Sequence, residues 1–411
     1  MSALLDAGIW RAVVLSGPRR VGKSRLLFQL ADELRRTVPG AKVVYHDFTV
    51  PTLRETGLAG VVSAFEISAG DEPRHFFLFD EVHHVQGWAE QLTDLVNRRA
   101  AKVVVADSSA AVLTRARESL GTGRWTRIDV DPLSFGQWLD LRRVETGVSV
   151  EELPPASLAD ACRTWIQLGG FPEYALQEAR MGYVHRLLNE DVVLKATRFD
   201  VAPIAGIRRP DALEAILDSI LRQSGKELSY KDLPGKESEP TQRNWLRALL
   251  DSGLIWELPQ VDRSEGRRLR GKPKIYSVDS ALVAAKHPGA PPPPAGPWPS
   301  MVETVVATGL RRSSRETGAE IGWAGKSARW EVDFVHVEDG CCTAIEVTVG
   351  PPEKKLVRLK SAMDAVRADR GLVVHDRFDR PTEDPATGVV ILGVHDLLLA
   401  LEGRTGARWA W

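Results

Sequence analysis

A glycine-rich turn between an apolar run and a helical stretch constrains the fold of this chain more than any other feature. Residues 17–24 read GPRRVGKS and match the pattern G-x-x-x-x-G-K-[S/T]. The apolar run Trp10 to Leu15 precedes the turn, and the amphipathic stretch RLLFQLADELRR follows it. A strand, a tight turn and a helix in this order predict an α/β sheet with a phosphate-binding loop at its carboxyl edge.

Each residue type of this loop suits the binding of a nucleoside triphosphate. Gly17 and Gly22 permit backbone angles that turn successive N–H groups toward phosphate, and the helix N-terminus adds its dipole. Lys23 can neutralise the β and γ phosphates, and the Ser24 hydroxyl can occupy one position on Mg²⁺. The residues expected to bind the nucleotide are Gly17, Pro18, Arg19, Arg20, Val21, Gly22, Lys23, Ser24 and Arg25.

A second group of candidate residues stands in the apolar run HFFLFDEVHH, residues 75–84. Because ligands bind at the carboxyl ends of parallel strands, we expect Asp80 to face the loop and hold Mg²⁺ through water. Glu81 is then the base that polarises the attacking water. The adjacent His83 and His84 point in different directions and have no third ligand at a useful spacing, so we interpret them as loop polarity.

The fourth apolar run, VVVADSS, ends in polar side chains that lie where a group could sense the γ-phosphate. We assign this role to Ser108, whereas Ser109 is as easily the cap of the following helix. An arginine that reaches a phosphate, in cis or from a neighbouring subunit, stabilises developing charge, and simple solvation explains any one arginine here equally well. The candidates are Arg115, Arg117 and Arg124.

Five short apolar runs, each followed by enough residues for a crossover helix, predict a parallel sheet covered on both faces. These runs are Trp10 to Leu15, Lys42 to Asp47, His75 to Asp80, Lys102 to Ala106 and Trp125 to Val130. We therefore expect residues 1–133 to form a P-loop core of the α/β class. The helical pattern of residues 134–222 predicts a helical lid.

Residues 223–287 predict a winged-helix module, because a helix at 241–251 is followed by two strands with a basic loop between them. Such a loop lies along the nucleic-acid backbone, so double-stranded DNA is a candidate partner whose binding weakens with salt. A charged hairpin is also often only solvated, and winged helices serve as protein docking surfaces too. The candidate DNA contacts are Arg243, Arg263, Arg267, Arg268, Arg270, Lys272 and Lys274.

A proline-rich stretch, residues 288–300, predicts a stiff linker before a smaller α/β domain at 301–411. The chain carries 54 basic and 55 acidic residues, so no general field marks it as a binder of nucleic acid or membrane. No apolar run approaches the ~20 residues that a membrane-spanning helix needs. We expect no membrane contact and a cytoplasmic location, where the three cysteines stay reduced.

Several motifs in a fixed order resemble a family of bacterial and archaeal AAA-type ATPases with a C-terminal domain similar to the PD-(D/E)XK (restriction-endonuclease-like) nucleases. The resemblance spans nearly the whole chain and rests on GPRRVGKS, LFDEVHHVQGW, DSSAAVLTRARESLGTGRW leading to PLSF, GGFPEYAL, GKPKIYSVDSAL, EVDF and IEVT. It implies ATP hydrolysis with Mg²⁺ by Lys23, Ser24, Asp80 and Glu81, a sensor at Ser108 and a catalytic arginine at Arg124.

The nuclease-like domain departs from its family pattern at one position that bears on activity. The pattern needs acids for divalent metal and a lysine two residues after the last acid, and that position holds Thr348. Lys326 or Lys354 could substitute from a neighbouring element, but loss of the cation favours a degenerate, binding-only domain. The acids available for this degenerate site are Glu303, Asp333 and Glu346.

The sequence therefore favours a Mg²⁺-dependent ATPase that is coupled to DNA or to protein partners. One alternative is a nucleotide-gated switch that turns ATP over slowly and recruits proteins. An active metal-dependent nuclease is a less favoured alternative. Self-association, in which an arginine crosses to the nucleotide of a neighbouring subunit, remains open.

Overall fold

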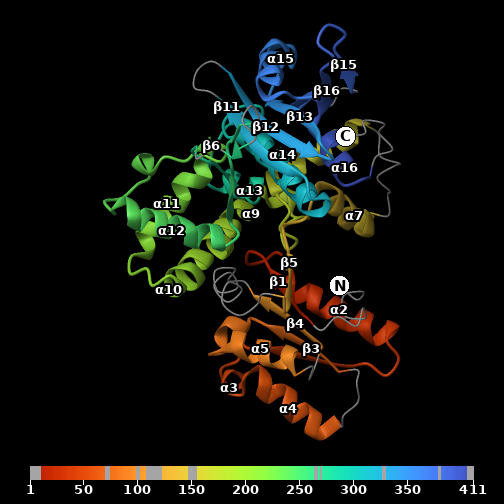
Figure 1. Ribbon diagram of the computed structural model, residues 1–411, viewed down its shortest axis with the longest axis vertical. Coiled ribbons are helices and arrows are strands. Elements are labelled where there is room, and N and C mark those ends of the chain that lie inside the picture. The colour runs from red at the N-terminus through yellow and green to blue at the C-terminus, as the bar shows by residue number, and fades with distance from the viewer. Residues whose placement is uncertain are drawn as a thin grey trace. The chain divides into compact units, whose positions relative to one another are not determined.

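The computed structural model describes residues 11–69, 75–98, 102–107, 123–146, 155–262, 267–268, 271–325, 330–377 and 381–404. The chain divides into two compact units, both drawn in Figure 1. The first unit comprises Met1–Asp131, Lys195–Pro210 and Arg247–Gly253, and the second comprises Pro132–Leu194, Asp211–Leu246 and Leu254–Trp411. Within the described residues, no helix combines the length and the apolar character needed to cross a bilayer.

A five-stranded parallel sheet forms the centre of the first unit, with the strand order β2-β3-β4-β1-β5. Every pairing within it is parallel. The α/β class and the parallel sheet that the apolar runs predict are therefore confirmed. The strands are β1 (Ala12–Ser16), β2 (Lys42–Asp47), β3 (His75–Asp80), β4 (Lys102–Asp107) and β5 (Trp125–Asp129).

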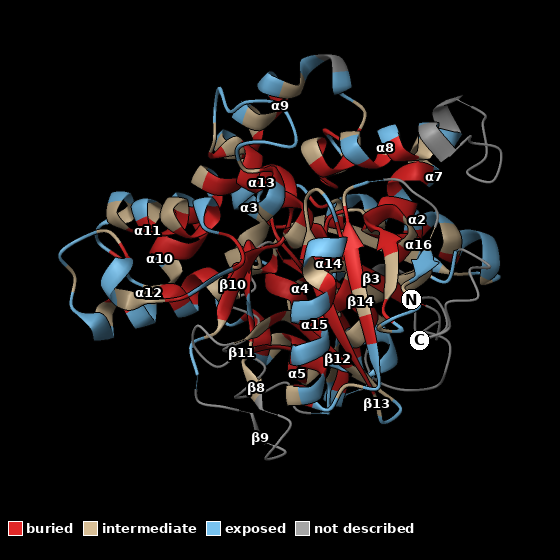
Figure 2. Ribbon diagram, turned by 90° about the horizontal axis from the view of Figure 1, so that it is seen from above, coloured by how far each residue is buried: buried red, intermediate tan, exposed pale blue. Residues whose placement is uncertain are grey.

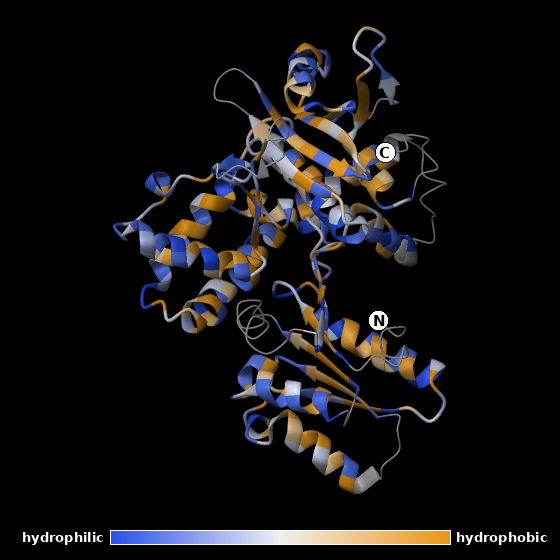
Figure 3. Cartoon of the chain, viewed as in Figure 1, coloured by the Kyte–Doolittle hydropathy of each residue, from blue (hydrophilic) through white to orange (hydrophobic). Residues whose placement is uncertain are grey.

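Alternate side chains of the strands pack on opposite faces of this sheet. Val13 and Leu15 of β1 share a core with α2 (Lys23–Thr37), whereas Ala12 and Val14 face α4 (Gly57–Ala69) and α5 (Trp88–Asn97). Figure 1 shows α2 on one side of the sheet and α4 and α5 on the other. In Figure 3 the strands are mostly hydrophobic while α2 carries both colours, as expected for a sheet covered on both faces.

The order of the strands makes β1 the point where the chain changes direction across the sheet. The chain passes from β1 to the edge strand β2, returns through β3 and β4, and then crosses β1 to reach β5. In open α/β sheets, ligands bind at the carboxyl ends of the strands at such a point. Residues 17–24 follow β1 directly, so the fold places this loop where a ligand is expected.

Two later segments of the chain complete the first unit. One contains the π-helical segment η6 (Ala196–Val201) and the short helix α10 (Ala202–Ile204). The other is the last part of α12 (Glu239–Asp251) with the turn that follows it. A Cβ atom built at Gly253 in this turn would lie 3.4 Å from Cδ of Pro18. The glycine-rich loop is therefore flanked by residues that are distant in the sequence.

A mixed six-stranded sheet dominates the second unit, with the order β11-β12-β13-β14-β16-β15. Phe334 and Ile345 on one face belong to the core that contains α14 (Trp298–Thr317), and Val335 and Ala344 on the other face pack with α15 (Glu353–Val366). Figure 2 shows the buried strand interiors and the exposed outer side of α15. The strands are β11 (Glu320–Gly325), β12 (Glu331–Glu338), β13 (Cys341–Thr348), β14 (Arg370–His375), β15 (Thr382–Glu383) and β16 (Val390–Gly393).

The helical pattern predicted for residues 134–222 corresponds to a series of short helices. The helices are α7 (Phe135–Thr146), α8 (Pro155–Leu168), η4 (Glu178–Arg180), α9 (Met181–Leu187), η5 (Leu188–Leu194) and α11 (Pro210–Arg222), besides η6 and α10. Helices α7 and α8 contribute buried residues, among them Phe135, Trp138 and Ile166, to the large core of the second unit.

The region predicted as a winged helix contains a three-stranded antiparallel sheet with the order β6-β10-β7. Its strands are β6 (Lys226–Glu227), β7 (Ile255–Leu258) and β10 (Lys274–Ser277), and α11 and α12 precede β7 in the sequence. A second, two-stranded pair joins β8 (Val261–Asp262) to β9 (Arg267–Arg268). The winged-helix interpretation of this arrangement stays a prediction.

The proline-rich stretch at 288–300 lies within the second unit. Helix α14 begins inside it, at Trp298, and packs in the same core as α13 (Ser280–Ala285). The prolines prevent regular structure between the two helices, as the sequence predicts, but the elements on either side share one core. Composition shows that a segment is stiff. Only packing shows whether the elements on either side of that segment form separate domains.

Candidate functional site

The glycine-rich loop after β1 has a backbone conformation that most residues other than glycine could not adopt. A Cβ atom at Gly17 would lie 2.1 Å from the carbonyl oxygen of Val130, so any side chain there collides with the backbone. Gly22 has φ of 95° and Arg20 has φ of 68°, both in the left-handed region. This geometry curls the loop at the N-terminus of α2, where backbone N–H groups and the helix dipole favour an anion.

Lys23 lies buried at the start of α2, with 5% of its surface exposed. Its Nζ donates to the carbonyl oxygens of Gly17 and Pro18, each at 2.9 Å. Burial lowers the pKa of Lys23, while the charges of nearby Glu81, Asp107 and Asp80 act in the opposite direction. The ammonium is thus held inside the loop by neutral carbonyls, so an anionic ligand would improve its surroundings.

Asp80 ends β3 and is buried beside the loop, with 3% of its surface exposed. It accepts hydrogen bonds from the hydroxyls of Ser24 and Tyr45 and from the backbone N–H of Glu81. Burial raises the pKa of Asp80, and the bond from Ser24 opposes this shift. A carboxylate and a hydroxyl in direct contact offer the oxygen ligands that Mg²⁺ prefers, so these residues fit the metal that the loop motif implies.

Glu81 follows Asp80 and adopts an unusual backbone conformation, with φ of 51°. A non-glycine residue in the left-handed region carries strain, which is retained mostly at functional sites. Its Oε2 lies 3.3 Å from Nδ1 of His83, and the same Nδ1 lies 3.1 Å from Oδ1 of Asp107. The backbone N–H of His83 also donates to Oδ2 of Asp107, at 3.1 Å.

The interpretation of His83 as mere loop polarity is therefore wrong. Ligand atoms of Glu81, His83 and Asp107 all lie within 4.8 Å of one another, because the end of β4 supplies the third group that sequence spacing does not reveal. Burial lowers the pKa of His83, but its bond to Asp107 and the charges of Asp107 and Glu81 outweigh burial and raise it. His83 thus links the predicted base to a fully buried carboxylate.

Of the other two predicted catalytic residues, the structure describes only Arg124. Ser108 lies outside the described residues, and the last described residue of β4 is Asp107. Arg124 precedes β5, where its carbonyl accepts a hydrogen bond from Ala12 N at 3.0 Å and its Nε donates to Asn97 at 2.8 Å.

The position of Arg124 excludes the in-cis role that sequence reasoning leaves open. Because parallel strands begin at one edge of a sheet, Arg124 lies at the amino edge, beside the first residue of β1. The phosphate loop follows the last residue of β1, Ser16, and a strand of 5 residues spans about 17 Å. Arg124 is therefore out of reach of the loop of its own chain.

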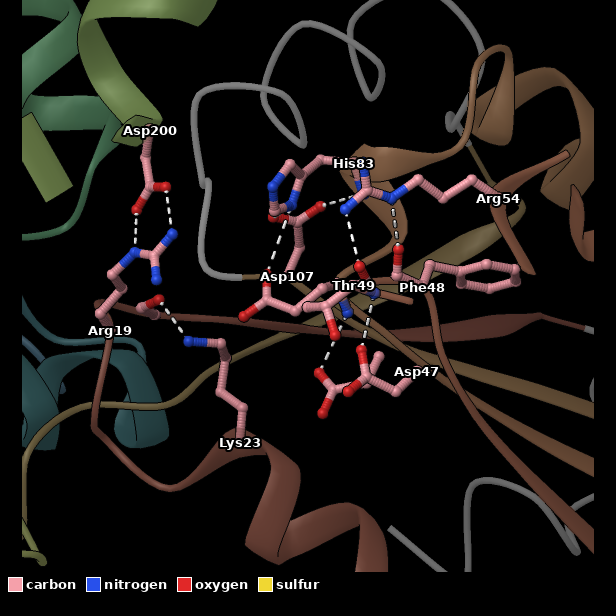
Figure 4. A network of polar contacts seen from close by, with 12 residues as sticks. Arg19, Lys23, Asp47, Phe48, Thr49, Arg54, His83, Asp107 and Asp200 are labelled. Carbon is pink, nitrogen blue, oxygen red and sulfur yellow. Dashed lines mark hydrogen bonds and ion pairs between the residues drawn. The ribbon is translucent and has the colours of Figure 1, made fainter. Parts of the chain in front are cut away.

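The structure adds a pair that the sequence does not predict. Arg19, in the loop, donates from Nε and Nη2 to the two carboxylate oxygens of Asp200, at 2.5 and 2.6 Å. Asp200 belongs to η6 and is 3% exposed, whereas Arg19 is 31% exposed. Figure 4 shows the Arg19 guanidinium pointing to Asp200, with Lys23 drawn in the same network of polar contacts. The residues are 181 positions apart, so no local pattern could have revealed the pair.

A second group of carboxylates lies in the second unit. Glu303 of α14 accepts a hydrogen bond from the hydroxyl of Tyr276 at 2.7 Å, and Asp333 of β12 accepts one from Val347 N at 2.9 Å. Burial, followed by the charge of Asp333, raises the pKa of both Glu303 and Glu346 to about 7. The fold therefore brings the three acids of the predicted degenerate nuclease site close enough to influence one another.

Lys274, predicted as a DNA contact, belongs to this carboxylate group instead. It is 4% exposed, and its Nζ lies 2.8 Å from Oε1 of Glu331 and 3.5 Å from Oδ1 of Asp333. Burial lowers the pKa of Lys274, but the charges of Asp333 and Glu303 outweigh burial and raise it. The DNA-contact prediction for Lys274 is wrong, because the pleat of β10 directs this side chain into the unit.

The lysine that accompanies the last acid comes from α15. Nζ of Lys355 lies 2.5 Å from Oε1 of Glu346, and Thr348 stands where the family pattern has its lysine. Sequence reasoning proposes Lys354, one residue away, or Lys326, which lies outside the described residues. Tertiary packing determines which face of a helix is turned toward a sheet. The sequence, with two adjacent lysines, therefore does not show which of them faces the sheet.

The remaining predicted DNA contacts are only partly described. Arg243 is exposed, pairs with Glu239 at 2.9 Å and lies over the ring of Tyr230 at 5.2 Å. Lys272 is exposed, and the backbone of Arg267 and Arg268 forms β9. Arg263 and Arg270 lie outside the described residues.

Comparison with known families agrees with the loop geometry. Residues 10–139 match the family described as "AAA domain". This stretch, which contains the glycine-rich loop and the five-stranded sheet, is therefore similar to AAA-type P-loop domains. Residues 159–289 match a domain of unknown function, DUF8612.

Relatives of this chain occur in a bacterium and in an archaeon. An uncharacterised protein of Haemophilus influenzae is 24% identical over 281 residues, which are 66% of this chain and 67% of that protein. An uncharacterised protein of Methanocaldococcus jannaschii is 22% identical over 340 residues, 78% of this chain and 71% of that protein.

Solved structures give weaker likenesses. The replication initiator DnaA bound to AMPPCP and single-stranded DNA aligns with a TM-score of 0.30 and 12% identity, covering 60% of this chain and 75% of that one. The Aeropyrum pernix ORC2 protein aligns with a TM-score of 0.36 and 12% identity, covering 69% and 89%. At these values neither likeness bears on the function of this chain.

Proposed function

We propose that this chain binds ATP with Mg²⁺ and hydrolyses it at the loop after β1. The observation that carries the proposal is that Asp80, at the end of β3, and Glu81, directly after it, lie close enough to the loop lysine for their charges to act on it. The charges of Asp80 and Glu81 act on buried Lys23, and Asp80 accepts a hydrogen bond from Ser24. A loop of N–H groups, a buried ammonium and a hydroxyl–carboxylate pair are what a metal-bound triphosphate requires.

The roles of the residues follow from their surroundings. The loop N–H groups and Lys23 bind the phosphates, and Lys23 exchanges its carbonyl partners for phosphate oxygens. Ser24 and Asp80 would hold Mg²⁺, which supplies neutralisation of the charge that develops on the phosphate oxygens. Glu81 orients the attacking water and accepts its proton, while His83, fixed by Asp107, holds the Glu81 carboxylate in place.

The experiment compares ATP turnover and ATP binding in three forms of the chain. Glu81→Gln should keep nucleotide affinity and lower kcat by about 10²- to 10⁴-fold, because Gln cannot accept the proton. Glu90→Gln changes an exposed glutamate on α5 of the same unit and should leave both quantities unaltered. Unchanged turnover in Glu81→Gln would reject Glu81 as the base.

The proposal extends to DNA through the loop between β7 and β10. Lys272 is exposed there, and Arg263, Arg267, Arg268 and Arg270 lie in the same basic stretch. Each phosphate that such residues neutralise releases counterions, so binding should weaken steeply with salt. A DNA shift titrated with salt, for the wild type and for a variant with Arg267, Arg268 and Arg270 all changed to Glu, tests this. A shift that survives the triple change would favour the alternative, a switch that recruits proteins.

We infer that the acids of the second unit do not cleave nucleic acid. The support is the direct pairing of Lys274 with Glu331 and of Lys355 with Glu346, which fills oxygen positions that a divalent metal would need. Incubation of plasmid with Mg²⁺ or Mn²⁺ should leave it uncut. Nicking that disappears in Asp333→Ala would establish a nuclease instead.

A further inference from the structure

The pairing of Arg19 with Asp200 connects the phosphate loop to a segment outside the sheet. Both carboxylate oxygens of Asp200 accept from the guanidinium, in the two-point geometry that fixes an arginine most firmly. Asp200 is almost fully buried, and the guanidinium of Arg19 offsets the cost of burying its carboxylate. The bond to Asp200 raises the pKa of Arg19, which therefore stays charged throughout.

Arg19 has one donor group, Nη1, that its bonds to Asp200 do not use, and several charged residues of the loop site lie near the guanidinium. The two bonds to Asp200 use Nε and Nη2, which leaves Nη1 as a further donor group. The charges of Glu81 and Asp107 act on Arg19, and the charge of Arg19 acts on Lys23. Arg19 is thus close to the groups that surround the proposed phosphate position, as Figure 4 shows for Lys23 and Asp107.

The local structure around Asp200 is also unusual. Asp200 lies in the π-helical segment η6, directly before the short helix α10. Wide helical turns of this kind are rare and occur mostly at functional sites. The loop end of the pair is likewise irregular, since neighbouring Arg20 has a positive φ. Asp200 itself and the residue next to Arg19 therefore both have unusual backbone conformations.

Two roles for Asp200 are physically distinct. Asp200 could compete with phosphate for Arg19, so that nucleotide binding breaks the pair. That would leave a buried carboxylate with no cation, which is strongly unfavourable. Alternatively, Asp200 keeps Nε and Nη2 and presents Nη1 to the nucleotide, and no buried charge loses its partner. The burial of Asp200 favours the second role.

We propose that Asp200 is a positioning residue that holds Arg19 against the terminal phosphate of bound ATP. This inference rests on the proposed function. Arg19 then supplies, from within the same chain, the positive charge that Arg124 is too distant to supply. The segment 195–210 is in this way connected to the terminal phosphate through the side chain of Arg19.

The test is a double-mutant cycle in the full chain, read out as dissociation constants for ADP and for a non-hydrolysable ATP analogue. Asp200→Asn keeps the shape of the side chain but removes its charge, and should weaken the analogue about tenfold. Arg19→Ala should weaken it about tenfold or more, and ADP should change less than about threefold in either variant. The double variant should bind the analogue no more weakly than Arg19→Ala alone, because Asp200 acts through Arg19.

A matched control breaks a different arginine–aspartate pair of the same unit. Asp94→Asn, on α5, removes the partner of Arg98, which follows the helix. The pair is exposed, with an Nε–Oδ1 distance of 2.8 Å, and its loss should change neither dissociation constant. If Arg19→Ala does not fold, Arg19→Lys replaces it in the cycle, since Lys keeps the charge but lacks the planar fork.

Three results would overturn the proposal. Asp200→Asn could bind the analogue like the wild type, or lose ADP and analogue equally, which is the sign of a purely structural role. The two single effects could also add in the double variant. A wild type that binds neither nucleotide would instead reject the proposed ATPase function, so the two failures are distinguishable.

Discussion

Both units of the chain bring lysines close to carboxylates, yet they pair these charges differently. In the first unit Lys23 donates to carbonyl oxygens of its own loop, and Asp80 accepts from two hydroxyls and an amide. In the second unit Lys274 and Lys355 pair directly with carboxylates. In the first unit the lysine and the acid are therefore not paired with each other, whereas in the second unit the lysines and acids are.

The difference shows in the pKa of the two buried lysines. Burial lowers the pKa of Lys23, whose bonded partners are neutral. The pKa of Lys274 is raised, because the charges of Asp333 and Glu303 outweigh burial. A buried ammonium without an anion is costly to the fold, whereas one paired with carboxylates is held by them. The first arrangement gains from an incoming triphosphate, and the second has its charge already balanced.

The largest expected effect comes from removing each lysine in turn. Lys23→Met should weaken ATP binding by more than about 100-fold but change the free energy of unfolding by less than about 1 kcal/mol, since no carboxylate loses a direct partner. Lys274→Met should lower the free energy of unfolding by about 3 kcal/mol, because Asp333 loses a buried cation and Glu331 keeps only the more distant Arg358. Chemical denaturation and calorimetry measure both, with exposed Lys272→Met as the control. Equal destabilisation by the two changes would remove the contrast.

A smaller effect should appear in the pH dependence of the second unit. The pKa of Glu303 rises from 4.5 to about 7 on folding, so the folded chain binds its proton more tightly than the unfolded chain. The contribution of Glu303 to the free energy of unfolding is complete below pH 4.5 and is lost as the pH rises to about 7. Over this range the free energy of unfolding falls by at most about 1.4 kcal/mol per pH unit.

Glu303→Gln isolates this contribution because Gln stays neutral at every pH. The free energy of unfolding, measured by denaturation at several pH values between 4.5 and 8, should decrease less with pH for Glu303→Gln than for the wild type. Glu320→Gln, on the exposed first residue of β11, is the control and should follow the wild type. Parallel curves for Glu303→Gln and the wild type would show that Glu303 is not buried in charged surroundings.

The link between Glu81 and Asp107 predicts a moderate kinetic effect. His83→Ala should lower kcat about tenfold with little change in ATP affinity, because Glu81 loses the group that orients it. The neighbouring His84→Ala should leave kcat within about twofold, since His84 makes no described contact with Asp107. Steady-state ATP turnover distinguishes the two, and a kcat for His83→Ala equal to that of the wild type would contradict the link.

The smallest expected effect concerns Arg124. Because this residue lies at the amino edge of the sheet, Arg124→Ala should not change turnover in a monomer. Sedimentation with and without a non-hydrolysable ATP analogue establishes the assembly state, and turnover is then compared across protein concentrations. A loss of activity confined to concentrations at which the chain associates would assign Arg124 to a neighbouring subunit's nucleotide.

The sequence predicts well those features that a short stretch of backbone determines. Residues 17–24 need a glycine where a side chain would collide with the backbone, and the strand that ends in Asp80 is apolar from Phe76 to Phe79. Both features can therefore be predicted from the local sequence. The parallel order of the strands then places the acids beside the loop without further information. The acids Glu303, Asp333 and Glu346 are readable through the resemblance to a known family.

Features that depend on distant packing are absent from the sequence prediction. Asp200 meets Arg19 across 181 positions, and Asp107 meets His83 from another strand. Lys274 reads as one more basic residue of a charged loop until the pleat of β10 is known. Spacing along the chain limits which residues are neighbours only within one element, so side chains that meet through tertiary contacts escape it.

The central claim is that the loop after β1 holds a metal-bound triphosphate together with the acid at the end of β3. Calorimetric titration of ATP, with and without Mg²⁺, into the wild type and Asp80→Asn tests it most directly. The wild type should bind ATP more tightly when Mg²⁺ is present, and Asp80→Asn should lose most of that difference. No uptake of ATP by the wild type, or the same gain from Mg²⁺ in both proteins, would contradict the claim.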